Sequence, residues 1–342
     1  MAVWKLMCFV LLVDLVCSST GRTNENAEDK RGFPFLFQFQ APLSGKAFQR
    51  HIKRLGNAMR YGVDGDPDFI VDVHGTDEYP LCFHVGGQQG EVLRLLQHQN
   101  LSLFVNAKII ERNETRKTYL GSVAIIRNNV RIFATRRGVQ VNNYPFTWSD
   151  MAAFLLYGNR VIVGRNLLAV TFRNKNVTLV IRRHAMSVEH DDSLEEPANN
   201  VGESMSEIVH GHMNPSSHDG TSRNHAVTSQ NTEFAYLGFY IADSTGLTAP
   251  CHGLLGQFVH KIVRLVNMQV KNGKMKGKLA VDSPFSSTPT YTMATLTERM
   301  NHGTGRNVTC WRLRRGGDNI VDGNYIDYMV PQLRDTEIIR FQ

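Results

Sequence analysis

Beyond residue 68, apolar residues fall into short β-branched or aromatic runs bounded by polar turn sequences. Asn-Asn, Gly-Asn and Asn-Lys-Asn separate many of these runs, and such sequences favour tight turns between strands. Many short strands at near-regular spacing predict an all-β fold, either a large antiparallel β-sandwich or a barrel-like domain. The predicted strands are Phe69–Val73, Leu81–Val85, Val92–Leu96, Leu101–Val105, Tyr119–Ile126, Val130–Ala134, Val139–Val141, Val161–Val163, Leu167–Phe172 and Val177–Ile181.

Two stretches have helical spacing instead. Phe48, Ile52 and Leu55 would give a basic helix over residues 47–60 one apolar face, and residues 150–156 predict a second, short helix. Further along, residues 261–270 and 276–281 flank an Asn-Gly pair, which predicts a β-hairpin.

The polar stretches divide the chain. Residues 186–232 are rich in Ser, Asn, His, Glu and Gly and nearly lack aromatics, which predicts a disordered insertion in the β domain. Residues 1–21 predict a signal peptide, since a short apolar run is followed by small residues. Residues 22–62 then form a basic leader or propeptide, and the β domain extends over 63–335.

Composition agrees with secretion. The 342-residue protein carries a net charge of +7, and no later stretch is apolar for long enough to span a bilayer. Behind the signal peptide three cysteines remain, Cys82, Cys251 and Cys310, and an oxidising compartment favours one disulfide and one odd thiol. Four glycosylation sequons fit the same route, at Asn100, Asn113, Asn176 and Asn307.

Basic residues cluster on several predicted strands and turns. Clusters of this kind could line a groove for a sulfated or carboxylated polysaccharide, although an ordinary solvated face is the commoner outcome. Nucleic acid is not an expected partner of a secreted protein. The candidate glycan-binding residues are Arg136, Arg137, Arg182, Arg183, Lys274, Lys276 and Lys278.

The chemically most fragile bond lies where the basic leader meets the β pattern, in Asp64-Gly65-Asp66-Pro67-Asp68. The carboxylate of Asp66 could attack its own main-chain carbonyl, with Pro67 as the leaving side and a cyclic anhydride as the product. The alternative is a tight Asp-Gly turn before a strand. Three neighbouring carboxylates would raise the pKa of one of them.

Other chemistry finds little support in the sequence. The spacing of these aspartates fails the calcium-loop pattern, which also needs a glycine and a distal acid, and His210-Gly-His212 lacks further ligands at a fixed spacing. Neither a nucleophile–base arrangement nor a phosphate-binding loop is present. We therefore predict a protein without metal or cofactor and without enzymatic activity, apart from a single-turnover self-cleavage.

Six separated segments of the sequence match one known family when they are taken together. They are residues 63–70, 80–85, 237–244, 252–258, 310–311 and 321–331. These segments resemble the C-terminal region of inter-alpha-trypsin inhibitor heavy chains, keep that family's order and span about residues 63 to 333. Their Asp-Pro and Gly-Leu-Leu-Gly parts also look faintly like von Willebrand D modules, which implies a β-rich fold.

This resemblance implies a function in the extracellular matrix. In that family the Asp-Pro bond is cut during secretion, and the new C-terminal Asp becomes ester-linked to chondroitin sulfate and can pass to hyaluronan. Carried over, Asp66 would be the reactive residue. Protease inhibition in that family belongs to a Kunitz-type partner, bikunin, and no Kunitz-like segment is present here. Hyaluronan, chondroitin sulfate and bikunin-like or other matrix proteins are therefore the expected partners.

The resemblance also implies a disulfide between Cys82 and Cys310, which leaves Cys251 as the odd thiol or the source of an intermolecular bridge. The sequence departs from the family in three ways. It has Asp68 where the family has a histidine, and an ionised Asp cannot protonate the departing nitrogen as a histidine could. The insertion is longer than the family's loop, and the large N-terminal domains of the heavy chains are not expected in this protein.

Overall fold

The computed structural model describes residues 37–39, 45–59, 61–65, 67–73, 79–172, 176–186, 233–284, 286–313, 317 and 320–340. The predicted signal peptide, Asp66, and the predicted insertion apart from its first residue lie outside these ranges. The protein divides into Met1–Phe37 and Gln38–Gln342, and the description concerns the second unit. Strand β1 (Phe37–Phe39) stands at the start of the described residues.

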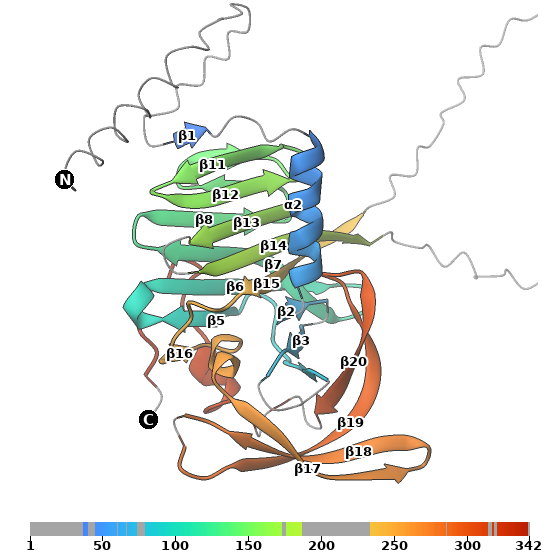
Figure 1. The fold of residues 1–342 in the computed structure, drawn as a ribbon. Coiled ribbons are helices and arrows are strands. Elements are labelled where there is room, and N and C mark those ends of the chain that lie inside the picture. The colour runs from blue at the N-terminus through green and yellow to red at the C-terminus, as the bar shows by residue number, and fades with distance from the viewer. Residues whose placement is uncertain are drawn as a thin grey trace, which may run out of the picture. The chain divides into compact units, whose positions relative to one another are not determined.

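Strands dominate this unit, as the hydrophobic pattern predicts, and they form two arms of one sheet (Figure 1). The first arm runs β10 (Tyr144–Phe146), β9 (Val139–Val141), β8 (Val130–Thr135), β7 (Lys117–Arg127), β6 (Leu103–Arg112), β5 (Val92–His98), β16 (Cys251–His252). The second begins β11 (Ala152–Leu156), β12 (Asn159–Gly164), β13 (Leu167–Phe172), β14 (Val177–Met186), β15 (Phe234–Asp243).

The second arm then continues through segments from both ends of the sequence. After β15 come β2 (Tyr61–Asp64), β3 (Asp68–Val71), β4 (Leu81–His84), β20 (Arg306–Leu313), β19 (Thr290–Asn301), β18 (Lys274–Asp282) and β17 (Ile262–Lys271). Only the step from β4 to β20 is parallel among these pairings. Segments that are distant in sequence therefore meet around β2, β3 and β4.

The two arms pack against each other. The guanidinium of Arg127 on β7 lies 4.7 Å from the ring centroid of Phe172 on β13, and its Nη1 donates to Asn159 Oδ1 on β12 at 3.3 Å. A ladder contact between Leu237 and Leu120 joins β15 to β7. The interior that the arms enclose is filled by their apolar side chains, so the all-β sandwich expected from the sequence is confirmed.

Helix α2 (Gly45–Ala58) covers the outer face of the second arm (Figure 1). Its apolar face packs against β12–β15, because Phe48 and Leu55 share one cluster with side chains of those strands, and Ile52 is partly buried beside them. Met59, which follows the helix, belongs to the same cluster. The helix begins two residues before the predicted one, and the predicted apolar face is the buried one. The predicted leader–domain boundary at residue 63 falls inside β2.

Turn chemistry follows the sequence closely. Asn272 and Gly273 have φ of 54° and 68°, the left-handed pair that a two-residue hairpin requires, and they join β17 to β18 as predicted. Asn128, Asn142 and Asn176 also have positive φ, and asparagine tolerates this left-handed conformation better than most residues.

The short helix predicted over 150–156 is wrong. Ala152–Leu156 is strand β11, paired along its length with β12. Alanine and leucine favour helices, but the Tyr157-Gly158 turn, with both φ positive, folds the segment onto its partner strand. Phe154 and Leu156 are then buried on one face, so tertiary pairing overrides local propensity.

Three single-turn 3₁₀ helices complete the described elements, η1 (Gln99–Leu101), η3 (Gly256–Val259) and η5 (Tyr325–Tyr328). None of the helices in the described ranges is long and apolar enough to cross a membrane.

Candidate functional site

The candidate site is the hairpin turn between β2 and β3, which carries the Asp-Pro sequence. Asp64 faces Asp68 across the ladder, so Gly65, Asp66 and Pro67 form the connection between them. Gly65 has a φ of +58°, a conformation that glycine adopts without a steric penalty. Pro67 is buried, and its carbonyl accepts a hydrogen bond from the backbone N–H of Val85 at 3.2 Å. The residues before and after Asp66 are therefore fixed in the fold, whereas Asp66 itself is outside the described residues.

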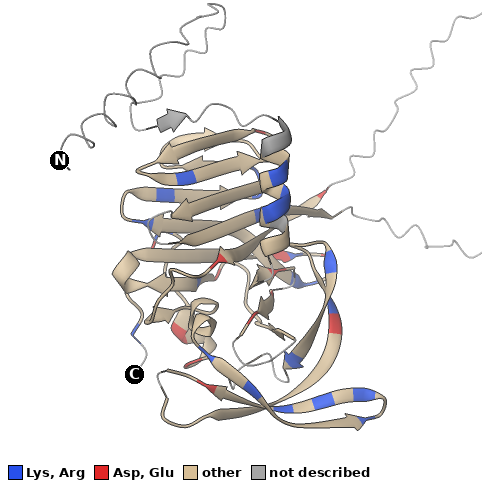
Figure 2. Cartoon of the chain, viewed as in Figure 1, with Lys and Arg blue, Asp and Glu red and all other residues tan. Residues whose placement is uncertain are grey.

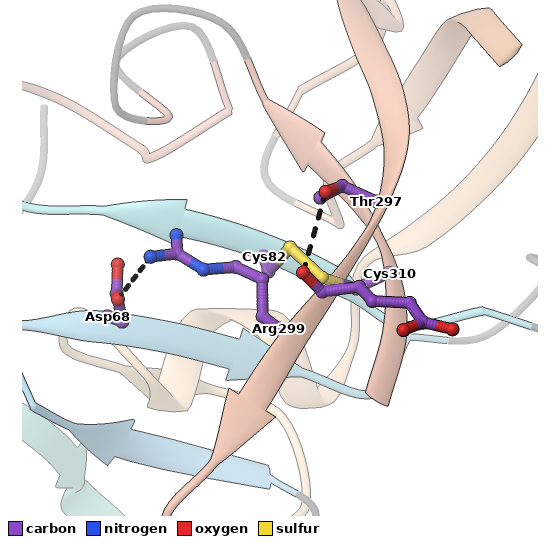
Figure 3. Close-up of a disulfide and its surroundings, with 6 residues drawn as sticks. Asp68, Cys82, Thr297, Arg299 and Cys310 are labelled. Atoms are coloured by element: carbon purple, nitrogen blue, oxygen red, sulfur yellow. Dashed lines mark hydrogen bonds and ion pairs between the residues drawn. A yellow bond between two sulfur atoms is a disulfide. The ribbon is translucent and has the colours of Figure 1, made fainter. Parts of the chain in front are cut away.

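On the β3 side, Asp68 is engaged by two basic groups. Arg299 on β19 donates from Nη2 to Oδ2 of Asp68 at 2.6 Å, and Figure 3 shows this side chain reaching toward the carboxylate. His84, the cross-strand neighbour of Asp68 on β4, has Nδ1 3.8 Å from Oδ1. The carboxylate of Asp68 is therefore already paired with a guanidinium.

On the β2 side, Asp64 is buried, with 3% of its surface exposed. Its Oδ2 accepts a hydrogen bond from the hydroxyl of Tyr240 on β15 at 2.7 Å, and its Oδ1 makes no hydrogen bond. Burial raises the pKa of Asp64 from 3.8 to about 6, which Tyr240 and the nearby charge of His302 partly oppose and Asp68 increases. Asp64 is thus the carboxylate with the raised pKa that the sequence led us to expect, and burial is the main cause of the increase.

A series of polar groups leads from Asp64 toward the surface. His184 on β14 has Nε2 3.1 Å from the hydroxyl of Tyr240, and burial lowers the pKa of His184 to about 3. A neutral His184 can therefore donate to Tyr240 while Tyr240 donates to Asp64. The ring of His184 stacks on that of Tyr236, with 4.9 Å between their centroids.

His302 stands at the exposed end of this series, in the turn between β19 and β20. Its ring centroid is 6.0 Å from that of His184 and 6.2 Å from that of Tyr236. A Cβ placed on Gly65 would lie 3.7 Å from both Cδ2 and Nε2 of His302. Next to it, Arg182 donates from Nη1 to the carbonyl of Gly303 at 2.6 Å. An exposed imidazole therefore borders the turn one residue before Asp66.

The sequence did not indicate Tyr240, His184 or His302. Tyr240 lies in a segment that the family resemblance includes, but neither spacing nor composition pairs it with Asp64 across 176 positions of sequence. The histidines had no recognisable context either. The available sequence signal for this site was Asp64, which lies two residues before the Asp-Pro bond. Its burial could not be predicted, because strand alternation does not show which residues are buried at the end of a strand.

A disulfide joins Cys82 on β4 to Cys310 on β20, the pairing that the resemblance implies (Figure 3). It lies next to the site, because Cys82 is the cross-strand partner of Ile70 on β3 and clusters with it. Cys251 is a free thiol with 0% exposure, and burial raises its pKa to about 12. This agrees with the odd thiol and leaves its sulfur inaccessible for an intermolecular bridge.

Six of the seven candidate glycan-binding residues occupy two regions (Figure 2). The first holds the two arginines of the β8–β9 turn beside Arg183, whose Nε donates to the carbonyl of Arg136 at 2.9 Å. Arg182 points to the other side of β14, toward Gly303. Lys274, Lys276 and Lys278 form the second region on the β17–β18 hairpin, which Figure 2 shows as a row of blue bands.

The four sequon asparagines, Asn100, Asn113, Asn176 and Asn307, are all exposed. A glycan on any of them would leave the core undisturbed. Glycosylation at these positions stays a prediction.

Comparison with known proteins finds similarity to one family. The family model for the C-terminus of the inter-alpha-trypsin inhibitor heavy chain matches residues 224–315. Inter-alpha-trypsin inhibitor heavy chain H3 of Bos taurus is 28% identical over 93% of this protein and 31% of its own length. Human H3 is 27% identical over 80% of this protein and 27% of its own length, and bovine H1 is 27% identical over 82% and 28%.

This protein spans about three tenths of the length of the curated relatives it matches. No solved structure matches it. The family model covers the β15 to β20 region, and the alignment with bovine H3 covers 93% of this protein. The protein is therefore one that resembles the C-terminal region of the inter-alpha-trypsin inhibitor heavy chains, in sequence order and over most of its length.

Proposed function

We propose that this protein is a secreted, non-enzymatic component of hyaluronan-rich extracellular matrix that cuts itself once at Asp66–Pro67 and becomes esterified through Asp66. Similarity to the heavy chains supports the setting, and so do the predicted signal peptide and the exposed sequons. The geometry of the hairpin supports the chemistry. The fragile bond belongs to the connection between Asp64 and Asp68, and both of these residues are fixed by the ladder and by side-chain partners.

In the proposed reaction, a carboxylate oxygen of Asp66 attacks the carbonyl carbon of the same residue. The bond to the Pro67 nitrogen breaks, and that nitrogen leaves with the electron pair and takes up one proton. The anhydride left on Asp66 is opened by water, or by a hydroxyl of chondroitin sulfate or hyaluronan, which gives an ester. Chondroitin sulfate on a bikunin-like or other matrix protein would supply the same hydroxyl.

The proton for the leaving nitrogen would come from His302. The carboxylate of Asp68 is paired with Arg299, whereas the imidazole of His302 is exposed and borders Gly65. Histidine is the side chain that exchanges protons near neutral pH, and general acid catalysis contributes about 10²- to 10⁴-fold. We expect His302→Gln to slow cleavage by about 100-fold. His84→Gln is the matched variant on the opposite side of the turn, and a larger loss there would assign the proton to His84.

Cleavage is tested by the intact mass of the protein recovered from the medium of expressing cells. Wild type should yield two polypeptides, one ending at Asp66 and one beginning at Pro67, and Asp66→Asn should yield one. Treatment with chondroitinase or hyaluronidase should leave a residual sugar mass on the N-terminal piece, which mild alkali removes because an ester is labile to base. A single uncut species from wild type at neutral pH would sink self-cleavage.

A second candidate function is non-covalent binding of anionic glycans by the β17–β18 hairpin. Lys276 and Lys278 alternate with Met275 and Gly277 and so share one face of β18. The ammonium of Lys278 lies 4.6 Å from the centroid of the Tyr291 ring, which is 52% exposed. A flat aromatic ring beside an ammonium group, with a second lysine on the same face of the strand, suits a carboxylated or sulfated sugar, whose apolar ring face can stack while its anion pairs.

Retention on a heparin or hyaluronan column separates the two candidates. Binding through the hairpin should fall with rising salt, survive Asp66→Asn, and weaken in Lys276→Ala/Lys278→Ala. Arg136→Ala/Arg137→Ala is the matched control in the other basic region. No retention at low salt would exclude this candidate.

A further inference from the structure

We infer that cleavage in the turn between β2 and β3 does not release the N-terminal piece: α2 and β2 stay bound, and the cut protein is a non-covalent complex of two polypeptides. A glycan esterified to Asp66 is then tethered to the whole β domain through β2. This use as a tether rests on the proposed function, whereas the retention itself rests on the fold alone.

The position of β2 in the sheet is the first argument. Strand β2 is an interior strand, paired with β15 on one edge and with β3 on the other. All four of its residues are buried, and at Gly62 an added Cβ would lie 2.3 Å from the carbonyl oxygen of Phe239. Cutting the connection between β2 and β3 removes one covalent link and none of these ladder hydrogen bonds.

Side chains anchor the same segment at three further points. The hydroxyl of Tyr61 donates to the carbonyl of Leu255, and Asp64 accepts from Tyr240 at 2.7 Å. The carbonyl of Met59, just before β2, accepts a hydrogen bond from Asn301 Nδ2 at 3.2 Å. Leu255 immediately precedes η3, Tyr240 lies on β15, and Asn301 ends β19. All three residues follow the cut in sequence, so the C-terminal piece holds this segment at three separate points.

Helix α2 adds an apolar anchor. Phe48 and Leu55 of the helix and Met59 just after it are 4%, 7% and 0% exposed, and they pack with Ile162, Leu167, Ala169, Val180 and Tyr240. The ring of Phe48 lies over Gly164, where an added Cβ would be 2.5 Å from its Cζ. A released N-terminal piece would expose this face and the four-residue slot left by β2, and addition of a strand to a sheet is an established mode of peptide binding.

The test cuts the full-length protein without relying on its own chemistry. A protease recognition sequence replaces Asp66, which also removes self-cleavage, and the purified protein is cut by that protease. Gel filtration in native buffer should then show both pieces in one peak, separating only in denaturant. Separate peaks in native buffer would overturn the inference, whether or not the wild-type protein cleaves itself.

Two further measurements test whether β2 and α2 are what retain the N-terminal piece. Amides of Tyr61–Asp64 should be as protected from hydrogen exchange in the cut protein as in the uncut one, and rapid exchange there would contradict retention. Phe48→Ala/Leu55→Ala in the cut protein should weaken retention by at least about 100-fold, because large-to-small core changes act through lost burial and cavities. Gln49→Ala, at an exposed position of the same helix, should leave it unchanged.

Discussion

At the scale of single residues, Asp64 is the group whose environment departs most from what the sequence indicates. Mutual repulsion among Asp64, Asp66 and Asp68 predicts one raised pKa, but burial at the end of β2 is the larger cause. The hydroxyl of Tyr240 and the charge of His302 oppose it only in part. A carboxyl with a pKa of about 6 changes its charge over the range in which secretory compartments acidify.

This pKa makes stability depend on pH. The pKa of Asp64 is about 6 in the folded protein and 3.8 when unperturbed, so the folded state holds the proton more tightly. The stability that this group contributes is fully present below about pH 4 and is lost as the pH rises through about 6. We expect the free energy of unfolding of Asp64→Asn, relative to wild type, to increase by about 1–3 kcal/mol between about pH 4 and about pH 7.5.

Urea unfolding of both proteins across this range measures the change. The pH dependence of the difference carries the prediction, since the new amide also alters hydrogen bonding by an amount that does not vary with pH. Glu114→Gln is a control of opposite sign, because the pKa of Glu114 is lowered by its hydrogen bond from Arg112. A difference between Asp64→Asn and wild type that stays constant with pH would refute the assignment.

At the scale of elements, the sequence predicts those parts in which local chemistry and tertiary structure agree. The Asn272-Gly273 hairpin and the apolar face of α2 are of this kind, since turn geometry and helical spacing are local properties. Ala152–Leu156 fails because its local propensity and its pairing conflict. Strand β19 had no prediction, because its Thr, Met and Glu residues lack a run of β-branched apolar side chains.

Hydrogen bonds of Arg94 attach the C-terminal segment to strand β5. Arg94 is fully buried and donates to Asp335 Oδ1 at 2.6 Å, to Asn106 Oδ1 at 2.6 Å and to Gln97 Oε1 at 2.7 Å. Its Nη1 also donates to the carbonyl of Glu337 at 2.9 Å. These bonds fasten the C-terminal segment to β5 and β6.

Asp335→Ala leaves the Arg94 guanidinium buried without its carboxylate, which typically costs about 3–5 kcal/mol of stability. We expect the free energy of unfolding to fall by that amount and the C-terminal segment to become sensitive to proteolysis. Glu337→Ala is the matched control, since only its main-chain carbonyl contacts Arg94 and its side chain is exposed. Equal losses in the two variants would show that the carboxylate is not the cause.

At the scale of the whole molecule, the site is assembled from segments that no local pattern connects. Asp64 and Tyr240 are 176 positions apart, and Arg299 reaches Asp68 across 231. The family resemblance brings these segments together in order, but it gives no contacts between them. The chemistry of Asp66–Pro67 could therefore be proposed from sequence, whereas its neighbours Tyr240, His184 and His302 required the fold.

The Cys82–Cys310 disulfide is the covalent counterpart of this long-range assembly. It closes a loop of 228 positions and links β4 to β20, the one parallel step in the path of the second arm. A crosslink across so long a loop restricts the unfolded polypeptide strongly, and its removal typically costs about 3–5 kcal/mol. Because β4 is the neighbour of β3, the loss should also loosen the hairpin that carries Asp66–Pro67.

We therefore expect Cys82→Ala/Cys310→Ala to lower the free energy of unfolding by about 3–5 kcal/mol, measured by urea unfolding without reductant. Wild type in reductant should fall to nearly the same value, because both treatments remove the same crosslink. Cys251→Ala removes a buried thiol that closes no loop, so its cost should be only about 1 kcal/mol and independent of reductant. If the double variant matched wild type instead, the ladder alone would hold β4 against β20, and the disulfide would contribute nothing to the site's rigidity.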